Sequence, residues 1–347
     1  MEKRYEYIAQ LVAVVLLVGG CFLVLKPFLT ATLLAAVVCI TTWPLYLKLL
    51  HRLKDRENLA ALTMTLSLVL LLILPMALVA YNLADNVTST YDAVQQVVES
   101  GPPEAPVWLK DLPLIGASAD AYWNLVAGSK TELAALGRRL LEPTKDFLLA
   151  GGIMLGQGVV EMSLAAFISF FLYRQGLALA GFATVAVAHL VGNNSGSVLD
   201  IVNSTVRGVM YGMVGTALAQ GFVATIGFAI AGVPAPLLLG VVTTLFSLIP
   251  VGPPLIWGAA AAWLFFQGEV GWGIFMLLWG FLLISSVDNV VKPILISRSS
   301  NLPFILGLFG VMGGVLAFGF VGIFIGPVLL AVGFSLIKEW EARVRVG

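Results

Sequence analysis

The sequence predicts an all-α polytopic integral membrane protein with about eight hydrophobic segments. Hydrophobic residues make up 59% of the 347 residues, charged residues only 11%, and the mean hydropathy is +0.99. A soluble domain carries roughly 25% charged residues. Two further observations support this class: long apolar runs alternate with short basic loops, and two apolar blocks in the C-terminal half are interrupted by glycine and proline. Those two blocks predict a pair of opposed re-entrant hairpins.

Residues 1–82 are expected to form three N-terminal transmembrane helices. Lys26-Pro27 is predicted to be a tight turn between the first two, and Pro75 a kink in the third. Residues 48–56 carry four Lys/Arg, so the positive-inside rule makes this loop cytoplasmic, and Lys3 and Arg4 agree with it. The apolar runs of the three helices are Ile8–Leu25, Phe28–Leu47 and Leu59–Tyr81.

Residues 83–150 form the largest polar region, with nine acidic and five basic side chains. It follows three spans, so it is expected outside the cytoplasm. Apolar residues recur at steps of three and four, which predicts amphipathic helices joined by a linker at Gly101–Pro106. These helices either pack at a membrane surface or between subunits, or they form a ligand-binding domain.

Residues 151–205 are expected to contain a fourth span and helices at the cytoplasmic interface. The span is predicted over Gly151–Tyr173, ending before Arg174, and a break is predicted at Gly192–Gly196. A fifth span, Val206–Ala231, follows and is rich in glycine, which lets a neighbouring helix approach closely.

Residues 206–347 are predicted to be the transport core and a cytoplasmic tail. The first hairpin has apolar limbs Ala235–Ile249 and Leu255–Phe266, and Pro250-Val-Gly-Pro-Pro254 interrupts them. Each limb is shorter than the roughly 20 residues of a full crossing. The limbs form either a re-entrant hairpin entered from outside or two short tilted crossings.

The second hairpin is predicted over Leu302–Ile337, with several glycines interrupting the apolar block. Arg298 precedes the block and Lys338 follows it, so both ends are expected in the cytoplasm. The two hairpins therefore enter from opposite faces. Secondary transporters use such an inverted arrangement to build a site at the middle of the membrane.

The motifs of this second half resemble those of the autoinducer-2 exporter (AI-2E) family, the PerM-like permeases. They are Gly232-Val-Pro…Gly240…Leu248-Ile-Pro-Val-Gly-Pro-Pro254 and Asp288-Asn289…Lys292-Pro293…Leu302-Pro303…Gly313-Gly314…Phe318-Gly319…Gly322…Gly326-Pro327. The resemblance implies a multi-pass transporter of the bacterial inner membrane, with both termini cytoplasmic as the charges indicate. It also implies export of a small polar solute such as autoinducer-2, or Na⁺(Li⁺)/H⁺ antiport, and a homo-oligomer such as a pentamer.

Glu161 is the clearest candidate for a coupling residue, because an ionisable side chain within a span is a functional candidate by default. It either binds a proton that couples to transport or holds helices together, for example against Arg207. Asp288, Asn289 and Lys292 form a second group at the cytoplasmic end of a span. Asp288 and Lys292, four residues apart, either pair in water or line the mouth of the path with Asn289.

The interrupting residues of the hairpins are candidates for a backbone-lined site. They either free backbone carbonyls and amides or only shape packing. Trp257, Trp263, Trp272 and Trp279 are expected to anchor the chain at the membrane interface or in lipid, and Gln157 and Gln220 to join helices. The hairpin candidates are Pro250, Gly252, Pro253, Gly313, Gly314, Gly326 and Pro327.

The sequence therefore predicts a secondary transporter rather than an enzyme. It contains no nucleophile motif, Walker motif or histidine metal pattern, so no cofactor or metal is expected, and nothing suggests a nucleic-acid partner. Cys21 and Cys39 lie in apolar runs and are interpreted as small apolar fillers. A non-transport envelope scaffold, using residues 83–150 as its partner surface, is the remaining alternative.

Overall fold

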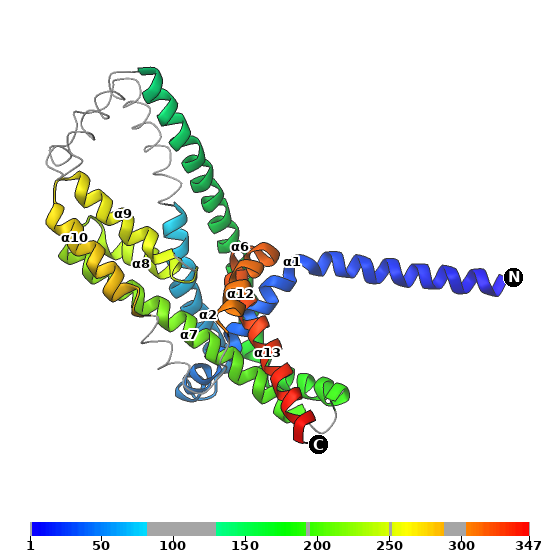
Figure 1. The fold of residues 1–347 in the computed structure, drawn as a ribbon. Coiled ribbons are helices and arrows are strands. Elements are labelled where there is room, and N and C mark those ends of the chain that lie inside the picture. The colour runs from blue at the N-terminus through cyan, green and yellow to red at the C-terminus, as the bar shows by residue number, and fades with distance from the viewer. Residues whose placement is uncertain (1, 82–129, 192–194, 250–251, 288–302, 347) are drawn as a thin grey trace. The chain divides into compact units, whose positions relative to one another are not determined.

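The computed structural model describes residues 2–81, 130–191, 195–249, 252–287 and 303–346, and every regular element within them is a helix (Figure 1). The chain divides into two compact units. Unit 1 contains residues 1–73, 158–210 and 299–347, and unit 2 contains residues 74–157 and 211–298. The all-α class and the multi-pass character are confirmed, since five of the described helical segments are long and apolar enough to cross a membrane.

The first helix corrects the prediction of a turn at Lys26-Pro27. Helix α1 runs without a break over Glu2–Arg52, 51 residues that extend about 75 Å at 1.5 Å per residue. Proline inside a helix removes one hydrogen bond and crowds the carbonyl four residues earlier, at a cost of about 3 kcal/mol, but its φ suits a helix. A charged residue followed by proline therefore does not by itself force a turn. The part of α1 that qualifies as a span is Phe28–Arg52, and Leu11–Cys21 is a shorter apolar stretch.

The next helix changes its winding just before Pro75. Helix α2 (Glu57–Leu68) passes into the π-helical segment η1 (Val69–Ile73), and the helix then continues to Tyr81. Pro75 offers no N–H to the carbonyl of Leu71, and a π-helical turn is a common local response to such a loss.

Helices α6 (Lys130–Val191) and α7 (Ser195–Ile230) are both longer than predicted. Helix α6 does not end before Arg174, and Gly176 lies against the ring of Trp43, where a Cβ would overlap it. The end of the membrane span within this helix stays a prediction. One glycine costs a helix only about 1 kcal/mol, and packing outweighs that. Helix α6 ends at Val191 and α7 begins at Ser195, and residues 192–194 of the predicted break lie outside the described residues. Ser195 and Gly196 are helical, and the stretch before Val206 belongs to α7 rather than to a separate interfacial helix.

Unit 2 contains the first predicted hairpin. Helix α8 (Pro236–Phe246) contacts α9 (Gly252–Phe266), and α9 packs along α10 (Val270–Trp279), which continues into the π-helical segment η3 (Gly280–Ile284) (Figure 1). Gly232, with φ of +70°, ends α7 in a left-handed turn that leads to α8. Helices α8 and α9 have 11 and 15 residues, about 16 and 22 Å, both less than the roughly 30 Å of a bilayer core.

Unit 1 contains the second hairpin. Helix α12 (Phe304–Phe318) and helix α13 (Gly322–Val346) lie side by side and are joined by the 3₁₀ turn η4 (Gly319–Val321) (Figure 1). The hairpin is confirmed, but its predicted breaks at the other glycines are wrong. Gly313 and Gly314 lie inside α12, and Gly326 and Pro327 lie inside α13.

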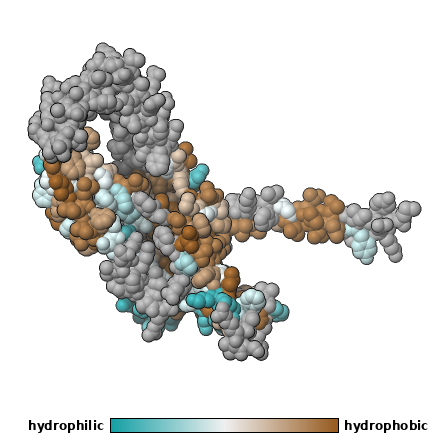
Figure 2. All heavy atoms as spheres, in the orientation of Figure 1, coloured by the Kyte–Doolittle hydropathy of each residue, from teal (hydrophilic) through white to brown (hydrophobic). Residues whose placement is uncertain are grey.

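Much of the outer surface of these helices is apolar, as a membrane protein requires. Leu16, Leu66, Phe222, Phe281 and Leu316 are among the exposed large side chains. Figure 2 shows apolar residues along the N-terminal half of α1 and over α9 and α10. Lipid is the solvent that accommodates such a surface.

Candidate functional site

Glu161 lies on α6 inside the candidate span Ala150–His189, and it faces the turn of the α12–α13 hairpin. The backbone amide of Val321 donates a hydrogen bond to its carboxylate. Its two carboxylate oxygens lie 3.8 and 3.9 Å from where a Cβ on Gly319 would stand. The Oε2 atom is buried and has no hydrogen-bond partner among the described residues. A half-satisfied carboxylate inside a span is expensive, so a functional role is a strong hypothesis.

The backbone of the turn explains why the carboxylate fits there. Gly319 has φ +64° and ψ −148°, a conformation open essentially to glycine alone. It lets the chain reverse sharply and present the amide of Val321 at the start of α13. The Glu161 carboxylate therefore meets a buried backbone donor rather than a side chain.

Glycines on both helices hold the hairpin together at close range. A Cβ on Gly314 would overlap the carbonyl oxygen of Gly322, and a Cβ on Gly326 would overlap that of Gly310. A Cβ on Gly310 would lie 2.7 Å from the Cα of Pro327. The two backbones are thus in direct contact, so these glycines serve packing. Packing was one of the two roles predicted for Gly314 and Gly326, whereas Gly310 and Gly322 were not predicted as candidates.

Arg207 does not pair with Glu161 within the part of the chain that the structure describes. Its Nε donates a 2.9 Å hydrogen bond to the carbonyl oxygen of Ile40 on α1. That carbonyl lacks its usual partner because residue 44, four positions on, is Pro44 and has no N–H. Arg207 therefore satisfies an open backbone acceptor inside unit 1 and joins α7 to α1.

Hydroxyl groups and a thiol join α1 to α6 nearby. The Tyr173 and Thr42 hydroxyls lie 2.6 Å apart, and Thr42 donates to the Val38 carbonyl, so Tyr173 is the donor between them. Cys39 donates weakly to the Ser169 carbonyl at 3.8 Å. These groups are satisfied and buried, which is the pattern of polar contacts that hold helices together in membranes.

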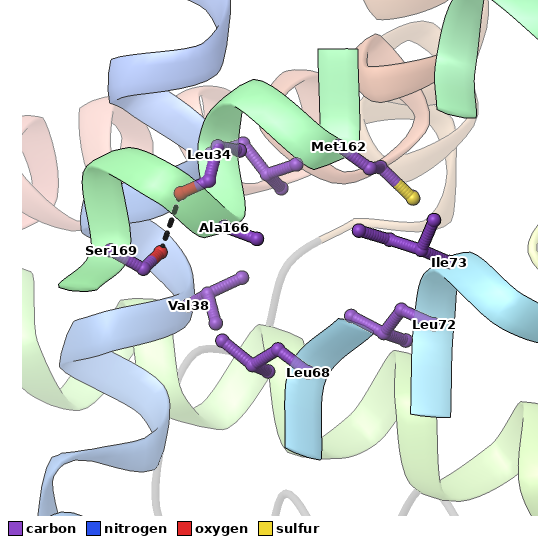
Figure 3. Close-up of a pocket in the computed structure, with 9 residues that line it drawn as sticks. Leu34, Val38, Leu68, Leu72, Ile73, Met162, Ala166 and Ser169 are labelled. Atoms are coloured by element: carbon purple, nitrogen blue, oxygen red, sulfur yellow. Dashed lines mark hydrogen bonds between the residues drawn. The ribbon is translucent and has the colours of Figure 1, made fainter. Parts of the chain in front are cut away.

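A small cavity lies between α1, α2, η1 and α6 (Figure 3). Its volume of about 20 Å³ is room for one water molecule, but its lining is almost entirely apolar. Ser169 contributes the one hydroxyl, and it donates to the Ala165 carbonyl at 2.8 Å. A cavity of this kind is expected to stay dry, and a polar solute does not fit it.

Unit 2 holds the remaining described candidates. Gly252 begins α9, where a Cβ would overlap the carbonyl oxygen of Phe246, so glycine closes the α8–α9 hairpin at short range. Pro253 follows in the first turn of α9, where proline is tolerated. Pro250, Asp288, Asn289 and Lys292 lie outside the described residues.

Two of the four tryptophans contradict the prediction of interfacial anchors. The indole Nε1 of Trp279 donates to the Val223 carbonyl at 3.0 Å, and its ring covers Gly227. The Trp257 ring covers Gly280, and its Nε1 is buried. Large rings opposite glycines indicate helix packing, whereas Trp263 and Trp272 remain partly exposed. The sequence signal for this packing was a tryptophan in one helix and a glycine in another. Sequence alone does not show which tryptophan packs on which glycine.

Sequence reasoning missed Thr216, which lies one turn from Gln220 on α7 in unit 2. Both are buried, with 3% and 2% of their surface exposed, and each has a polar atom without a hydrogen-bond partner. The spacing of four residues was the available signal, since it places both on one helix face. Within the described ranges, no group of three His, Cys, Asp or Glu side chains could hold a metal ion.

Comparisons with known proteins agree with the motifs in the second half of the chain. The chain matches the family described as AI-2E family transporter over residues 11–342. "Putative transport protein YdiK" of Escherichia coli (strain K12) is 34% identical over 332 residues, which cover 95% of this chain and 88% of that protein.

More distant relatives match over a similar length. A "Putative transport protein" of Buchnera aphidicola subsp. Baizongia pistaciae is 31% identical over 340 residues, covering 98% of this chain and 92% of the relative. One of Aquifex aeolicus is 26% identical over 319 residues, covering 89% of each chain. The family match and these relatives extend through both units, and the chain therefore belongs to the AI-2E family of membrane transport proteins.

Proposed function

We propose that this protein is a secondary transporter that exports a small polar solute and is coupled to protons through Glu161. The observation that carries the proposal is the Glu161 carboxylate, buried at one oxygen within a span and hydrogen-bonded to the turn of a helical hairpin. Family membership supports transport as the activity. The outward direction rests on the family description alone.

Proton binding at Glu161 would change its hold on the hairpin turn. A carboxylate is a stronger hydrogen-bond acceptor than a neutral carboxylic acid, and charge-assisted bonds are roughly twice as strong as neutral ones. Protonation therefore weakens the bond from Val321. Because α12 and α13 are in backbone contact through their glycines, they would respond as one body. This gives proton binding a mechanical consequence within unit 1.

The proposal extends to the membrane in which the protein lies and to its oligomeric state. Basic residues beside the spans favour cytoplasmic positions for both termini. The family resemblance favours the bacterial inner membrane and a homo-oligomer such as a pentamer. Na⁺(Li⁺)/H⁺ antiport is the second candidate, because a buried carboxylate can bind a proton and a cation in turn. A scaffold role would depend on residues 83–150 instead.

The test is transport by the purified protein in liposomes with an imposed proton gradient, comparing wild type with Glu161→Gln. Glutamine keeps the size of the side chain and an acceptor for Val321, but it cannot take up a proton. We expect the Glu161→Gln variant to exchange solute without responding to the proton gradient. Its side chain cannot bind a proton, but it keeps the hydrogen bond from Val321. The matched control is Glu269→Gln, at an exposed position between α9 and α10.

Three results distinguish the alternatives. If the gradient still drives flux through Glu161→Gln as through wild type, Glu161 is not the coupling residue. If an imposed Na⁺ or Li⁺ gradient moves protons through wild type without any added solute, the protein is an antiporter. If no solute or ion moves, transport itself is refuted in favour of the scaffold.

A further inference from the structure

Unit 2 encloses neutral polar atoms in an apolar interior. Between Tyr211 and Val287 the sequence contains a single Asp, Glu, Lys or Arg, namely Glu269, and it is exposed. The core that α7, α9, α10 and η3 form is otherwise apolar; its members include Ala224, Phe228, Leu264, Met276 and Ile284. Any polar group buried in this core therefore lacks a charged partner within that stretch.

Gln220 presents an unsatisfied acceptor to this interior. Its Nε2 donates to the Ile284 carbonyl at 3.2 Å, and its Oε1 is buried with no hydrogen-bond partner among the described residues. The orientation of the amide is determined, because exchanging the two atoms would place two acceptors against each other. The free atom is therefore the oxygen.

Thr216 adds a hydroxyl one helical turn away. Thr225, Thr243 and Thr244 in the same unit each donate to the carbonyl four residues earlier, at 2.8 to 3.0 Å. Thr216 makes no such bond, although it is only 3% exposed, and its Oγ1 has no partner in the part of the chain that the structure describes. Residues four apart have Cβ atoms about 5–6 Å apart, so Thr216 and Gln220 can contact one small molecule together.

The indole of Trp257 is a hydrogen-bond donor on a ring that lies against η3, the segment that Gln220 also contacts. Its ring covers Gly280 at the start of η3, while Gln220 binds the carbonyl of Ile284 at the end of η3. The indole Nε1 is buried without a hydrogen-bond partner within the described ranges, unlike that of Trp279, which donates to the Val223 carbonyl. The π-helical winding of η3 is itself a feature frequently found at functional sites.

We infer that Thr216, Gln220 and Trp257 form a binding site for an uncharged hydroxyl group, carried either by a neutral solute or by a water molecule. A hydroxyl can donate to the Gln220 oxygen while it accepts from the Trp257 indole or the Thr216 hydroxyl. A cation would leave the indole donor unmatched, and an anion would face the Gln220 oxygen. The site lies in unit 2 and is separate from Glu161. Its solute form rests on the proposed transport function, whereas its water form does not.

The site can be tested on the full-length protein labelled with 5-fluorotryptophan. The Trp257 fluorine resonance is assigned with Trp257→Phe, and erythritol, a neutral tetraol, is added as the probe. We expect erythritol to shift the Trp257 resonance, and Thr216→Val or Gln220→Met to weaken the apparent affinity about three- to tenfold per lost hydrogen bond. Thr225→Val is the matched control on α7, because its hydroxyl is already satisfied by Gly221.

A second reading separates water from solute. If erythritol has no effect but replacing H₂O with D₂O shifts the Trp257 resonance, and both variants abolish that shift, the occupant is water. If neither erythritol nor D₂O shifts it in wild type, or if the variants respond as Thr225→Val does, the site does not exist. A site that binds erythritol in a protein whose Glu161→Gln variant remains proton-coupled would leave this inference standing and overturn Glu161 as the coupling residue.

Discussion

In unit 1, Arg207 replaces a backbone hydrogen bond that Pro44 removes, although the two residues lie far apart in the sequence. Pro44 deprives the Ile40 carbonyl of its helical partner, and the Arg207 guanidinium supplies another at 2.9 Å. In a lipid environment no water could do so. The sequence suggested Arg207 as a partner for Glu161, but in the structure Arg207 donates to a backbone carbonyl instead.

Removing the guanidinium should therefore destabilise the protein through this carbonyl. We expect Arg207→Met to lower the free energy of unfolding by about 1.5–3 kcal/mol, the range for a hydrogen bond to a charged group. In the Pro44→Ala background the loss should be smaller, because residue 44 then offers its own N–H to Ile40. Unfolding of the four proteins in a double-mutant cycle measures this coupling; equal losses in both backgrounds would contradict it.

At the scale of single elements, the glycines of the α12–α13 hairpin have different structural roles. Gly319 reverses the chain, whereas Gly310, Gly314, Gly322 and Gly326 allow contact between the two backbones. Gly313, next to Gly314, has nothing within 4 Å of where a Cβ would stand. The paired glycines in the sequence are therefore not equivalent.

This difference gives a sharp comparison of two adjacent alanine substitutions. We expect Gly314→Ala to lower the free energy of unfolding by at least 1–3 kcal/mol, as for overpacking, because the new methyl group meets the backbone of Gly322. Gly313→Ala should be neutral or stabilising by up to about 1 kcal/mol, since alanine favours a helix and space is open. Thermal unfolding in detergent measures both, and similar effects would rule out backbone contact in the hairpin.

At the scale of the whole molecule, the charge distribution and the length of α1 give conflicting predictions for the side of the membrane on which its N-terminus lies. Lys3 and Arg52 should both be cytoplasmic by the positive-inside rule, yet they lie near opposite ends of a helix about 75 Å long. The N-terminal apolar side chains, such as Leu11, Leu16 and Leu17, are 67–70% exposed. Burying each in lipid is worth about 1.5–3 kcal/mol. A straight helix through Pro27 already bears the proline's lost hydrogen bond and crowding, about 3 kcal/mol, which a kink relieves in part. In a membrane we therefore expect α1 to bend at Pro27.

Cysteine labelling tests that expectation. With Cys21 and Cys39 replaced by alanine, Lys3→Cys should resist a membrane-impermeant maleimide in intact spheroplasts and react in inverted vesicles. His51→Cys, in the last turn of α1 and in the basic segment expected in the cytoplasm, is the matched control and should behave identically. Labelling of Lys3→Cys in intact spheroplasts would place the N-terminus outside and show that α1 crosses only once.

The sequence by itself determined the all-α membrane class, the family and both helical hairpins. These features depend on composition and on local conformation, which proline and glycine control directly. Glu161 was also identifiable, because an acidic residue stands out in an apolar run. Asp288, Asn289 and Lys292 remain predictions.

Only the tertiary structure decided which residues meet. Sequence did not reveal that Glu161 faces the turn after Gly319, that Arg207 binds the Ile40 carbonyl, or that Trp257 covers Gly280. It also did not reveal that α1 and α6 continue through Lys26-Pro27 and Arg174. The physical reason is the same in each case: helix continuity and polar satisfaction depend on neighbours supplied by distant parts of the chain, and a single sequence carries no direct record of those contacts.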